Sequence, residues 1–313
     1  MNILVVCDVL GEENNGTTIA AMNLIRYLKE QGENVRVLTA DESKMGQEGY
    51  FIVPVRSLGP LNPILKKNNV QLAKPKTSII LRALKGVDVV HIMLPFALGI
   101  KTSKLAKARG IPITAGFHCQ AENYSAHILN LMRFKPYNNH IYRKFYKKFY
   151  CRVNAIHYPT DFIRREFESI TKIKTNSYVI SNGVNDIYVK KEVKREPELK
   201  EKFNILFIGR ISKEKSHPIL LKAVSLSKYK DQIQLIFAGQ GPRENKIRKL
   251  EQKYELNPVL MQFYSRKKLI EIINSCDLYV HPSEIEIEAI SCLEAIKCGL
   301  VPVISDSDRK SVV

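Results

Sequence analysis

Short apolar runs alternate with helical patterns along the whole chain, and this alternation limits the possible folds more than any other feature of the sequence. The apolar runs of the first half lie at 3–7, 35–39, 89–93 and 112–117, and those of the second half at 205–209, 233–239, 277–282 and 301–304. Helical patterns separate them, for example from about Thr17 to Gln31 and near 96–109. β-Branched and aliphatic runs of this length between helices are typical of parallel strands covered on both faces. The sequence therefore predicts an α/β protein with two doubly wound, Rossmann-like domains.

A polar stretch rich in Lys and Glu separates the two series of runs. We therefore predict an N-terminal domain over 1–185, a linker over 186–202 and a C-terminal domain over 203–313. Ligands bind at the carboxyl ends of parallel strands, so two such domains predict a cleft between two sheets. The last run ends at Ile304, nine residues before Val313. A doubly wound domain normally covers its last strand with a helix, and we expect the second domain to be incomplete at its C-terminus.

Composition and cysteine spacing exclude several classes of protein. With 313 residues, of which 45% are hydrophobic and 26% charged, the chain can bury a large core and is neither disordered nor fibrous. No apolar run approaches the ~20 residues of a membrane-spanning helix, and the N-terminus has no basic leader, so we expect a cytosolic protein. The six cysteines include no C-x-x-C pair, which argues against a zinc site or a redox motif and fits reduced thiols.

Basic residues are concentrated in one part of the N-terminal half. The stretch 49–160 contains 18 Lys and Arg but only two acidic residues, Asp88 and Glu122, whereas the whole chain has 49 basic and 31 acidic residues. A charge that served solubility alone would not be localised in this way. The region therefore predicts an anionic partner.

The densest part of this region is 131–152, which contains seven Lys or Arg, seven Phe or Tyr and no acid. On a helix, five aromatic residues would form one stripe: Tyr142, Phe145, Tyr146, Phe149 and Tyr150. Four basic residues would flank the stripe: Arg143, Lys144, Lys147 and Lys148. This composition is typical of a helix that lies in a membrane interface. The alternative is that the aromatic stripe packs into the domain and the lysines face water.

We favour docking on an anionic membrane because the positive charge extends over the whole region, including Lys66, Lys67, Lys74 and Lys76. Each Lys or Arg near an anionic leaflet contributes about 1 kcal/mol, so several together are enough for reversible binding. Basic residues interleaved with aromatic ones also suit single-stranded RNA. No RNA-binding signature is present, however, and that function would leave the glutamates described below without a role.

Glycine and basic residues follow several of the predicted strands. Gly16 lies between a strand and a helix, where its backbone would approach an anion, although an ordinary loop with a threonine cap is an equal alternative. Arg210 and Lys215 lie just past a strand, where a diphosphate would bind, although two basic residues in a loop are often simply solvated. Gly239 and Gly241 would let the backbone come close to a bound group, or would form a plain strand-end turn. The Gly16 loop has no G-x-G-x-x-G fingerprint, so no nicotinamide or flavin cofactor is indicated.

Glutamates are concentrated between the last two apolar runs. A helix that begins near Ile287 would place Glu288 in its first turn and would carry Glu294, eight residues after Glu286. Glu294 lies among apolar residues, so we expect its carboxylate to face a cavity. A buried carboxylate needs partners, and sugar hydroxyls would serve.

His118 follows the strand at 112–117 and is a candidate to act on a ligand at the strand end. A lone strand-end histidine is more often structural than catalytic. A dyad with Cys119 is not expected, because successive residues of a strand point to opposite faces.

Taken in order, the motifs NGTT, FHCQAEN, SNGV, GR-x4-K, AGQGP and E-x7-E resemble those of the retaining glycosyltransferases of family 4, which have the GT-B fold. The resemblance extends from Ile3 to Ile304. It implies a nucleotide-sugar donor as substrate, with no separate cofactor and no metal. The FHCQAEN segment and the extra glutamates are most similar to the diacylglycerol glucosyltransferases of Gram-positive bacteria and mycoplasmas.

The resemblance also implies a role for each candidate residue. Gly16 would contact the donor, and His118 would lie near the donor sugar. Arg210 and Lys215 would neutralise the nucleoside diphosphate leaving group, a role that their charge suits because the reaction builds negative charge there.

The same resemblance places Glu286 beside the transferred sugar and gives Glu294 the ribose hydroxyls. Four features depart from the family pattern. Asn15 replaces the first of two paired glycines, and Ser216 replaces the glycine that follows the lysine. The E-x-F-G motif reads Glu286-Ile287-Glu288-Ala289, and the family's final helices are absent.

We therefore expect a peripheral enzyme on the inner face of the cell membrane. It would move a hexose, glucose from UDP-glucose, to the hydroxyl of a lipid, 1,2-diacylglycerol, with retention at the anomeric carbon. Its partners would be the nucleotide sugar and an anionic membrane, with no nucleic acid. The alternatives are a soluble or polysaccharide-linked acceptor, and an inactive remnant that still binds a nucleotide sugar or a membrane.

Overall fold

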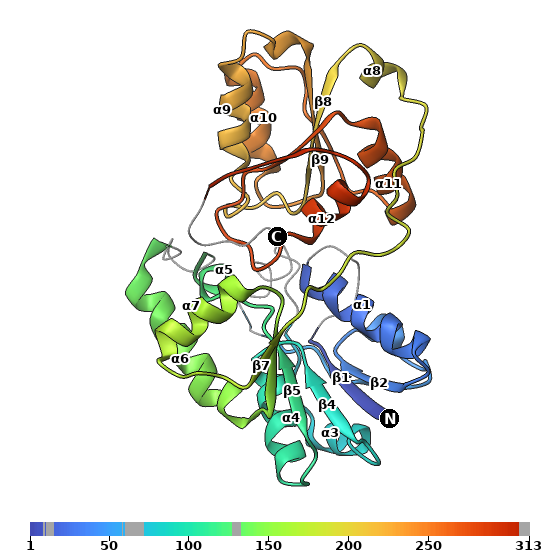
Figure 1. Ribbon diagram of the computed structural model, residues 1–313, viewed down its shortest axis with the longest axis vertical. Coiled ribbons are helices and arrows are strands. Elements are labelled where there is room, and N and C mark those ends of the chain that lie inside the picture. The colour runs from blue at the N-terminus through green and yellow to red at the C-terminus, as the bar shows by residue number, and fades with distance from the viewer. Residues whose placement is uncertain (9, 11–15, 58, 60–71, 127–132, 307–313) are drawn as a thin grey trace. The chain divides into compact units, whose positions relative to one another are not determined.

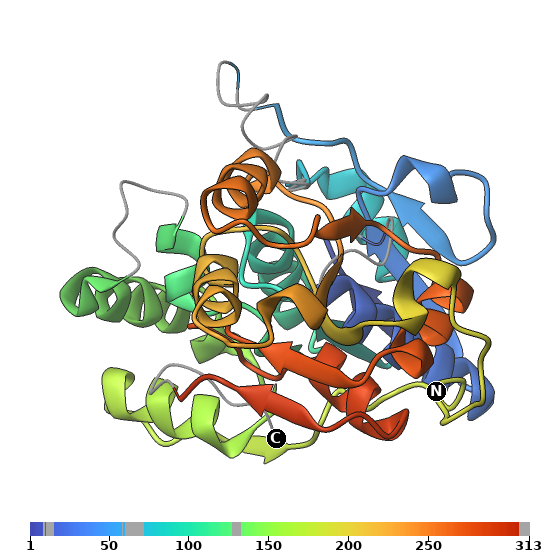
Figure 2. The ribbon, with the colours of Figure 1, turned by 90° about the horizontal axis from the view of Figure 1, so that it is seen from above.

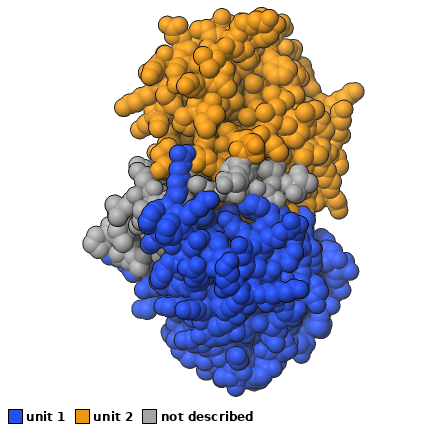
Figure 3. All heavy atoms as spheres, turned by 60° about the vertical axis from the view of Figure 1, so that its left-hand side comes forward, with its two compact units in different colours: residues 1–182 blue, residues 183–313 orange. Residues whose placement is uncertain are grey.

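The computed structural model describes residues 1–8, 10, 16–57, 59, 72–126 and 133–306 (Figure 1). The chain divides into two compact units, Met1–Asn182 and Gly183–Val313, which Figure 3 colours separately. Each unit is built on its own parallel sheet with helices packed around it. This is the architecture that the alternating apolar runs predict.

The first unit contains a seven-stranded parallel sheet in the order β3-β2-β1-β4-β5-β6-β7. Its strands are β1 (Asn2–Val6), β2 (Asn34–Thr39), β3 (Tyr50–Ile52), β4 (Val89–Ile92), β5 (Ile113–Gly116), β6 (Ala155–Tyr158) and β7 (Ser177–Val179). Its helices are α1 (Gly16–Glu30), η1 (Glu42–Lys44), α3 (Thr77–Ala83), α4 (Ala97–Lys107), α5 (Ala121–Ala126), α6 (Lys135–Lys148), η4 (Tyr150–Arg152) and α7 (Asp161–Thr171).

The second unit contains a five-stranded parallel sheet in the order β10-β9-β8-β11-β12. Its strands are β8 (Phe203–Ile208), β9 (Ile233–Ala238), β10 (Leu260–Gln262), β11 (Leu278–His281) and β12 (Pro302–Ile304). Its helices are α8 (Pro197–Lys200), α9 (His217–Ser225), η5 (Lys230–Gln232), α10 (Glu244–Lys253), α11 (Arg266–Ser275) and α12 (Ile290–Lys297). Helices α9 and α10 pack against each other, as two views at right angles show (Figure 1; Figure 2).

The strand order reverses once in each sheet. In the first unit the chain runs outward from β1 to β3 and then returns to place β4 on the other side of β1. In the second unit it runs from β8 to β10 and returns to place β11 on the other side of β8. Open parallel sheets bind their ligands at the carboxyl ends of the two strands where this reversal occurs.

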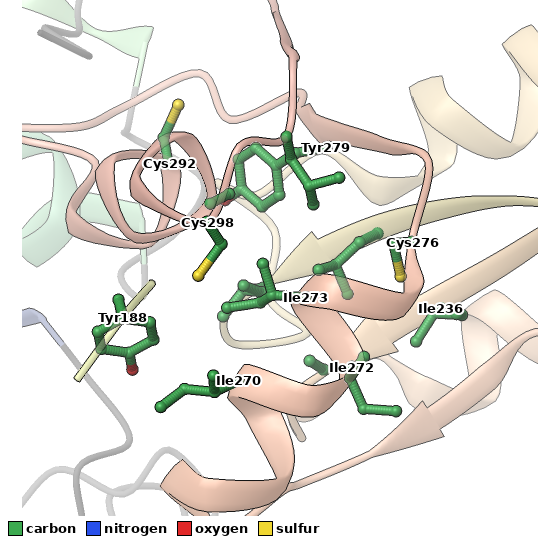
Figure 4. Close-up of a cluster of buried hydrophobic side chains, with 14 of the residues drawn as sticks. Tyr188, Ile236, Ile270, Ile272, Ile273, Cys276, Tyr279, Cys292 and Cys298 are labelled. Carbon is green, nitrogen blue, oxygen red and sulfur yellow. The ribbon is translucent and has the colours of Figure 1, made fainter. Parts of the chain in front are cut away.

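A cluster of buried apolar side chains forms the core of the second unit around α11 and α12 (Figure 4). Tyr188 and Leu199, which are 3% and 1% exposed, belong to this cluster. The backbone N–H of Lys191 donates to Asn274 on α11 at 2.7 Å. The prediction of a linker over 186–202 is therefore wrong, because this charged stretch also supplies apolar side chains to the core of the second unit.

Asp8 is a buried carboxyl group just after β1, with 2% of its surface exposed. Its Oδ1 accepts a hydrogen bond of 3.2 Å from the backbone N–H of Ala73. Burial raises the pKa of Asp8 to about 6, and the hydrogen bond from Ala73 opposes this shift without cancelling it. The carboxylate form is thus disfavoured in the folded protein.

We expect Asp8→Asn to stabilise the protein at neutral pH. Because the pKa of Asp8 is higher in the folded than in the unfolded chain, stability falls as the pH rises from about 4 to 6. The asparagine carries no charge and keeps an oxygen for Ala73, so the free energy of unfolding should rise by about 1–3 kcal/mol at pH 7 and change little near pH 4. Urea denaturation at the two pH values measures this, with the exposed Asp231→Asn as control. An equal effect of Asp8→Asn at both pH values would contradict the assignment.

Candidate active site

The loops after β8 and β11 bring charged side chains together in the second unit. Arg210 and Lys215 lie on the loop after β8, and Glu286 lies on the loop after β11. These strands are neighbours at the reversal of strand order, and their connections leave toward opposite sides of the sheet. Lys215 and Glu286 therefore meet at the place where open parallel sheets bind ligands, and Arg210 lies on the same loop as Lys215.

Glu286 is the centre of this group of charges. Its Oε1 forms an ion pair with Nζ of Lys215 and lies 2.8 Å from Nε2 of His281. Burial alone would raise the pKa of Glu286, but the charge of Lys215 and the hydrogen bond from His281 outweigh it and lower the pKa to about 2. Glu286 is therefore ionised at neutral pH.

The two oxygens of Glu286 have different environments. Both bonds go to Oε1, and within the described part of the chain Oε2 accepts no hydrogen bond. The side chain is 12% exposed. One carboxylate oxygen thus remains to accept a bond from a ligand, such as a sugar hydroxyl.

Arg210 is partly buried on the same loop. Burial lowers the pKa of its guanidinium, while the nearby Glu214 carboxylate acts in the opposite direction. An arginine stays protonated under these conditions. Arg210 and Lys215 therefore supply two positive charges to one loop, a combination suited to a diphosphate.

The segment before α12 differs from the prediction. We expected a helix from about Ile287 with Glu288 in its first turn, but α12 begins at Ile290. The backbone N–H of Glu284 donates to the carbonyl oxygen of Glu214 at 2.9 Å, which holds the segment in a loop against the β8 loop. Glu294 lies within α12 and is 5% exposed, so its burial agrees with its apolar flanks. Its contact with a ribose stays a prediction.

Ser216, one of the departures from the family pattern, has an unusual backbone conformation. Its φ angle is +50°, in the left-handed region where glycine is favoured. Its hydroxyl donates to Oε1 of Glu284 at 3.1 Å. This hydrogen bond compensates for the strain of a non-glycine residue at this turn.

Gly239 and Gly241 are required by the packing of neighbouring loops. A Cβ atom on Gly239 would lie 2.0 Å from the carbonyl oxygen of Gly209, and one on Gly241 would lie 2.3 Å from that of Ile211. The backbone N–H of Ile211 donates to the carbonyl oxygen of Gln240 at 3.0 Å. The loop after β9 thus holds the loop that carries Arg210, and a direct contact of these glycines with a donor stays a prediction.

In the first unit, the structure places Gly16 and His118 near the end of β5. Gly16 is the first residue of α1, and the hydroxyl of Thr17 donates to the carbonyl oxygen of His118 at 3.3 Å. The His118 ring is buried beside His157, with 5.8 Å between ring centroids. Burial, followed by the neighbouring histidines, lowers the pKa of His118 well below its ordinary value, so the imidazole is neutral.

The aromatic stripe of the basic segment packs inward. On α6 and just after it, Tyr142 and Phe149 are fully buried, Tyr150 is 2% exposed and Phe145 is partly buried. The prediction that Tyr142 and Phe149 contact a membrane is therefore wrong, because both rings are buried in the first unit, Tyr142 against Phe117 and Phe149 against Tyr150.

The basic side chains of the same helix are exposed: Arg143, Lys144, Lys147 and Lys148. The exposed Phe134 precedes α6. Lys66 and Lys67, the other predicted membrane residues, lie outside the described residues. The part of the predicted membrane-binding surface that the structure leaves exposed is therefore mainly a set of positive charges.

His281, Tyr279 and Ser291 were not among the residues that we selected from the sequence. Tyr279 and His281 are two apart on a strand, so they share a face, and this spacing was the only available signal. Among the described residues, no three His, Cys, Asp or Glu side chains are placed to hold a metal ion. No described helix is long and apolar enough to cross a membrane.

Comparisons with known proteins agree with this architecture. Residues 14–187 match the family described as Glycosyltransferase Family 4, and residues 189–311 match the one described as Glycosyl transferases group 1. A solved structure of HepE from Anabaena with UDP-glucose has a TM-score of 0.72 at 16% identity, covering 98% of this chain and 81% of that one. Sucrose-phosphate synthase from Thermosynechococcus elongatus has a TM-score of 0.71 at 15% identity with the same coverage. The two units thus have the GT-B fold of glycosyltransferases.

The chain belongs to Glycosyltransferase Family 4. Among curated proteins it is similar to an alpha-monoglucosyldiacylglycerol synthase from Streptococcus pneumoniae, at 24% identity over 97% of this chain and 71% of that protein. It is also similar to the sulfoquinovosyl transferase SQD2 of Arabidopsis thaliana, at 27% identity over 90% of this chain. The chain spans 55% of the length of that plant protein.

We expect Gly239→Ala to destabilise the second unit and weaken nucleotide binding. The new methyl group meets backbone atoms of Gly209 that cannot rotate away, so the cost should be about 1–3 kcal/mol. Thermal unfolding and calorimetric titration with UDP measure the two effects. Gly16→Ala is the control for stability, since a Cβ there meets no atom of the described residues within 4 Å. Unchanged stability of Gly239→Ala would contradict the close packing of the loops.

Proposed function

We propose that the chain is a retaining hexosyltransferase that moves glucose from UDP-glucose to 1,2-diacylglycerol. The observation that carries the proposal is the ionised Glu286, held by Lys215 and with one oxygen left open, on loops that also carry Arg210. The similarity to an alpha-monoglucosyldiacylglycerol synthase and to a sulfoquinovosyl transferase supports a sugar donor and a lipid acceptor.

The proposed mechanism follows from the charges at the β8 and β11 loops. When the bond between the sugar and the diphosphate breaks, negative charge develops on the departing phosphate oxygens. Arg210 and Lys215 stabilise that charge, because fixed donors act strongly where charge appears in the transition state. The ammonium of Lys215 has three N–H donors, so it can contact a phosphate while it keeps its bond to Glu286.

Glu286 would orient the sugar through its open oxygen. A hydroxyl of the transferred hexose donates to Oε2, which fixes the anomeric carbon relative to the leaving group. Retention at that carbon, the identity of the sugar and the role of Glu294 at the ribose are proposals that rest on the family resemblance. No protein group that forms a covalent intermediate is assigned.

The proposal of a lipid acceptor rests on the exposed basic face of α6 and on the similarity to the two relatives named above. Lys147 and Lys148 with Arg143 and Lys144 present positive charge to an anionic leaflet, where diacylglycerol resides. We propose that the protein binds there peripherally, on the inner face of the cell membrane. Because the aromatic stripe is buried, the attraction would be electrostatic and would weaken with added salt.

Transfer from radiolabelled UDP-glucose to diacylglycerol in vesicles tests the activity. We expect label in the organic phase, and a rate about 100- to 1000-fold lower for Arg210→Ala, because one stabilising donor is lost. Lys222→Ala, an exposed lysine on α9, is the control and should retain the wild-type rate. Label found only in water-soluble or polysaccharide products would show that the acceptor is not a lipid. UDP binding without any turnover would show that the chain is a non-catalytic binding protein.

Flotation with vesicles tests the docking face. We expect the double variant Lys147→Glu and Lys148→Glu to bind anionic vesicles roughly 30- to 1000-fold more weakly than the wild type, because two attractions of about 1 kcal/mol each are lost and repulsions of up to the same size replace them. The matched control makes the same charge change on exposed residues of α10, Lys246→Glu and Lys249→Glu. Equal binding of the two double variants would exclude α6 as the docking element.

A further inference from the structure

A hydrogen-bonded chain of buried side chains leads from the interior of the second unit to Glu286. The hydroxyl of Tyr279 lies 2.9 Å from Nδ1 of His281, and Nε2 of His281 lies 2.8 Å from Oε1 of Glu286. The Tyr279 hydroxyl also lies 2.9 Å from Oγ of Ser291 on α12. The chain thus connects β11 and α12 to the loop that carries the carboxylate.

The imidazole of His281 is held rigidly. It is 1% exposed and lies between two aromatic rings, those of Phe207 and Tyr279, each with 5.9 Å between centroids and 23° between planes. Phe207 and Tyr279 are themselves fully buried. A ring packed in this way cannot turn to follow a ligand, so its contact with Glu286 is a fixed feature of the fold.

The direction of the bond to Glu286 follows from its charge. An ionised carboxylate only accepts hydrogen bonds, so Nε2 of His281 must carry the proton and donate to Oε1. The hydroxyl of Tyr279 occupies Nδ1 and thereby fixes which nitrogen faces the carboxylate. Such a partner sets the tautomer of a histidine in the same way that it does in metal and catalytic sites.

Lys215 alone would not hold Glu286 in place during turnover. Its side chain is 19% exposed and lies on the loop that would meet a diphosphate, so a bound nucleotide competes for its ammonium. His281 lies in the core and remains beside Oε1 whatever Lys215 contacts. The donor from His281 is therefore the one that keeps Oε1 turned inward and Oε2 turned outward.

We propose that His281 is a positioning residue for the transfer reaction, that it donates from Nε2 to orient Glu286, and that Tyr279 fixes its tautomer. The inference rests on the proposed function in one respect, namely that Glu286 contacts the transferred sugar. The contact between His281 and Glu286 is a property of the protein without substrate.

Two substitutions of His281 distinguish the roles of its two ring nitrogens. The amide nitrogen of glutamine reaches the position of Nε2 and can donate to Glu286, whereas that of asparagine reaches only the position of Nδ1. We expect His281→Asn to lower kcat roughly 10- to 100-fold, the cost of one charge-assisted hydrogen bond, with the affinity for UDP unchanged. His281→Gln should recover most of the loss. Equal kcat values for the two variants would overturn the proposal.

Tyr279→Phe serves as a variant that keeps the packing, since it removes only a hydroxyl. We expect kcat to fall less than in His281→Asn, with the affinity for UDP again unchanged. If its thermal stability matches that of the wild type but kcat does not fall, the role of Tyr279 in fixing the tautomer is excluded.

A spectroscopic measurement tests the contact without any substrate. In ¹⁵N-histidine correlation spectra of the whole chain, assigned with His281→Gln, we expect a protonated Nε2 whose resonance moves on Glu286→Gln. An unmoved resonance would overturn the inference while leaving the transfer reaction untouched. A moved resonance in a protein that shows no transfer would instead reject the proposed function and retain the contact.

Discussion

The ion pair between Lys215 and Glu286 is the interaction on which the arrangement of the second unit's site depends. It joins the loops after β8 and β11, which leave the sheet toward opposite sides, and the hydrogen bonds that Glu284 forms with Glu214 and Ser216 join the same two loops. A further contact holds each loop. The loop after β9 packs against Gly209 and Ile211 of the β8 loop, and His281 in the core forms a hydrogen bond with Glu286 of the β11 loop. The charges are therefore set by the fold before any ligand binds, which is the condition for effective electrostatic catalysis.

A buried ion pair is costly unless further hydrogen bonds satisfy its members. Here the carboxylate has two donors on one oxygen, and this explains why its pKa falls to about 2 although burial acts in the opposite direction. The contact between Ser216 and Glu284 lies beside this pair and shows how a family pattern can change without loss of the turn. A serine at φ +50° is strained, and its hydroxyl gains a hydrogen bond to Glu284 that a glycine could not form.

The sequence predicted the sheets because the main strands are long apolar runs, and it located Arg210, Lys215 and Glu286 because each follows such a run. It did not predict β3, β6, β7 or β10. Three of these, β3, β7 and β10, are three-residue strands at the edges of their sheets, and β6 is a four-residue strand that includes a histidine. It also missed the start of α12 and the membership of 186–202 in the second unit, since both depend on contacts between residues distant in the sequence. His281 and Tyr279 were read only as strand residues, because polar groups that bond to one another in a core have no local signature.

The α6 segment shows why composition alone could not decide between a membrane and a core. An aromatic stripe flanked by lysines is compatible with a membrane interface and with a protein core, and the outcome depends on whether the rest of the domain provides packing partners for the rings. In this unit Phe117 and Phe167 are aromatic partners for Tyr142 and Tyr150, with ring centroids 5.3–6.2 Å apart, so the rings are buried in the core. The lysines remain exposed because burying their charged ammonium groups with the rings would cost free energy. Burial of the stripe thus anchors the helix to the domain and holds its positive face toward solvent, which is what reversible electrostatic binding requires.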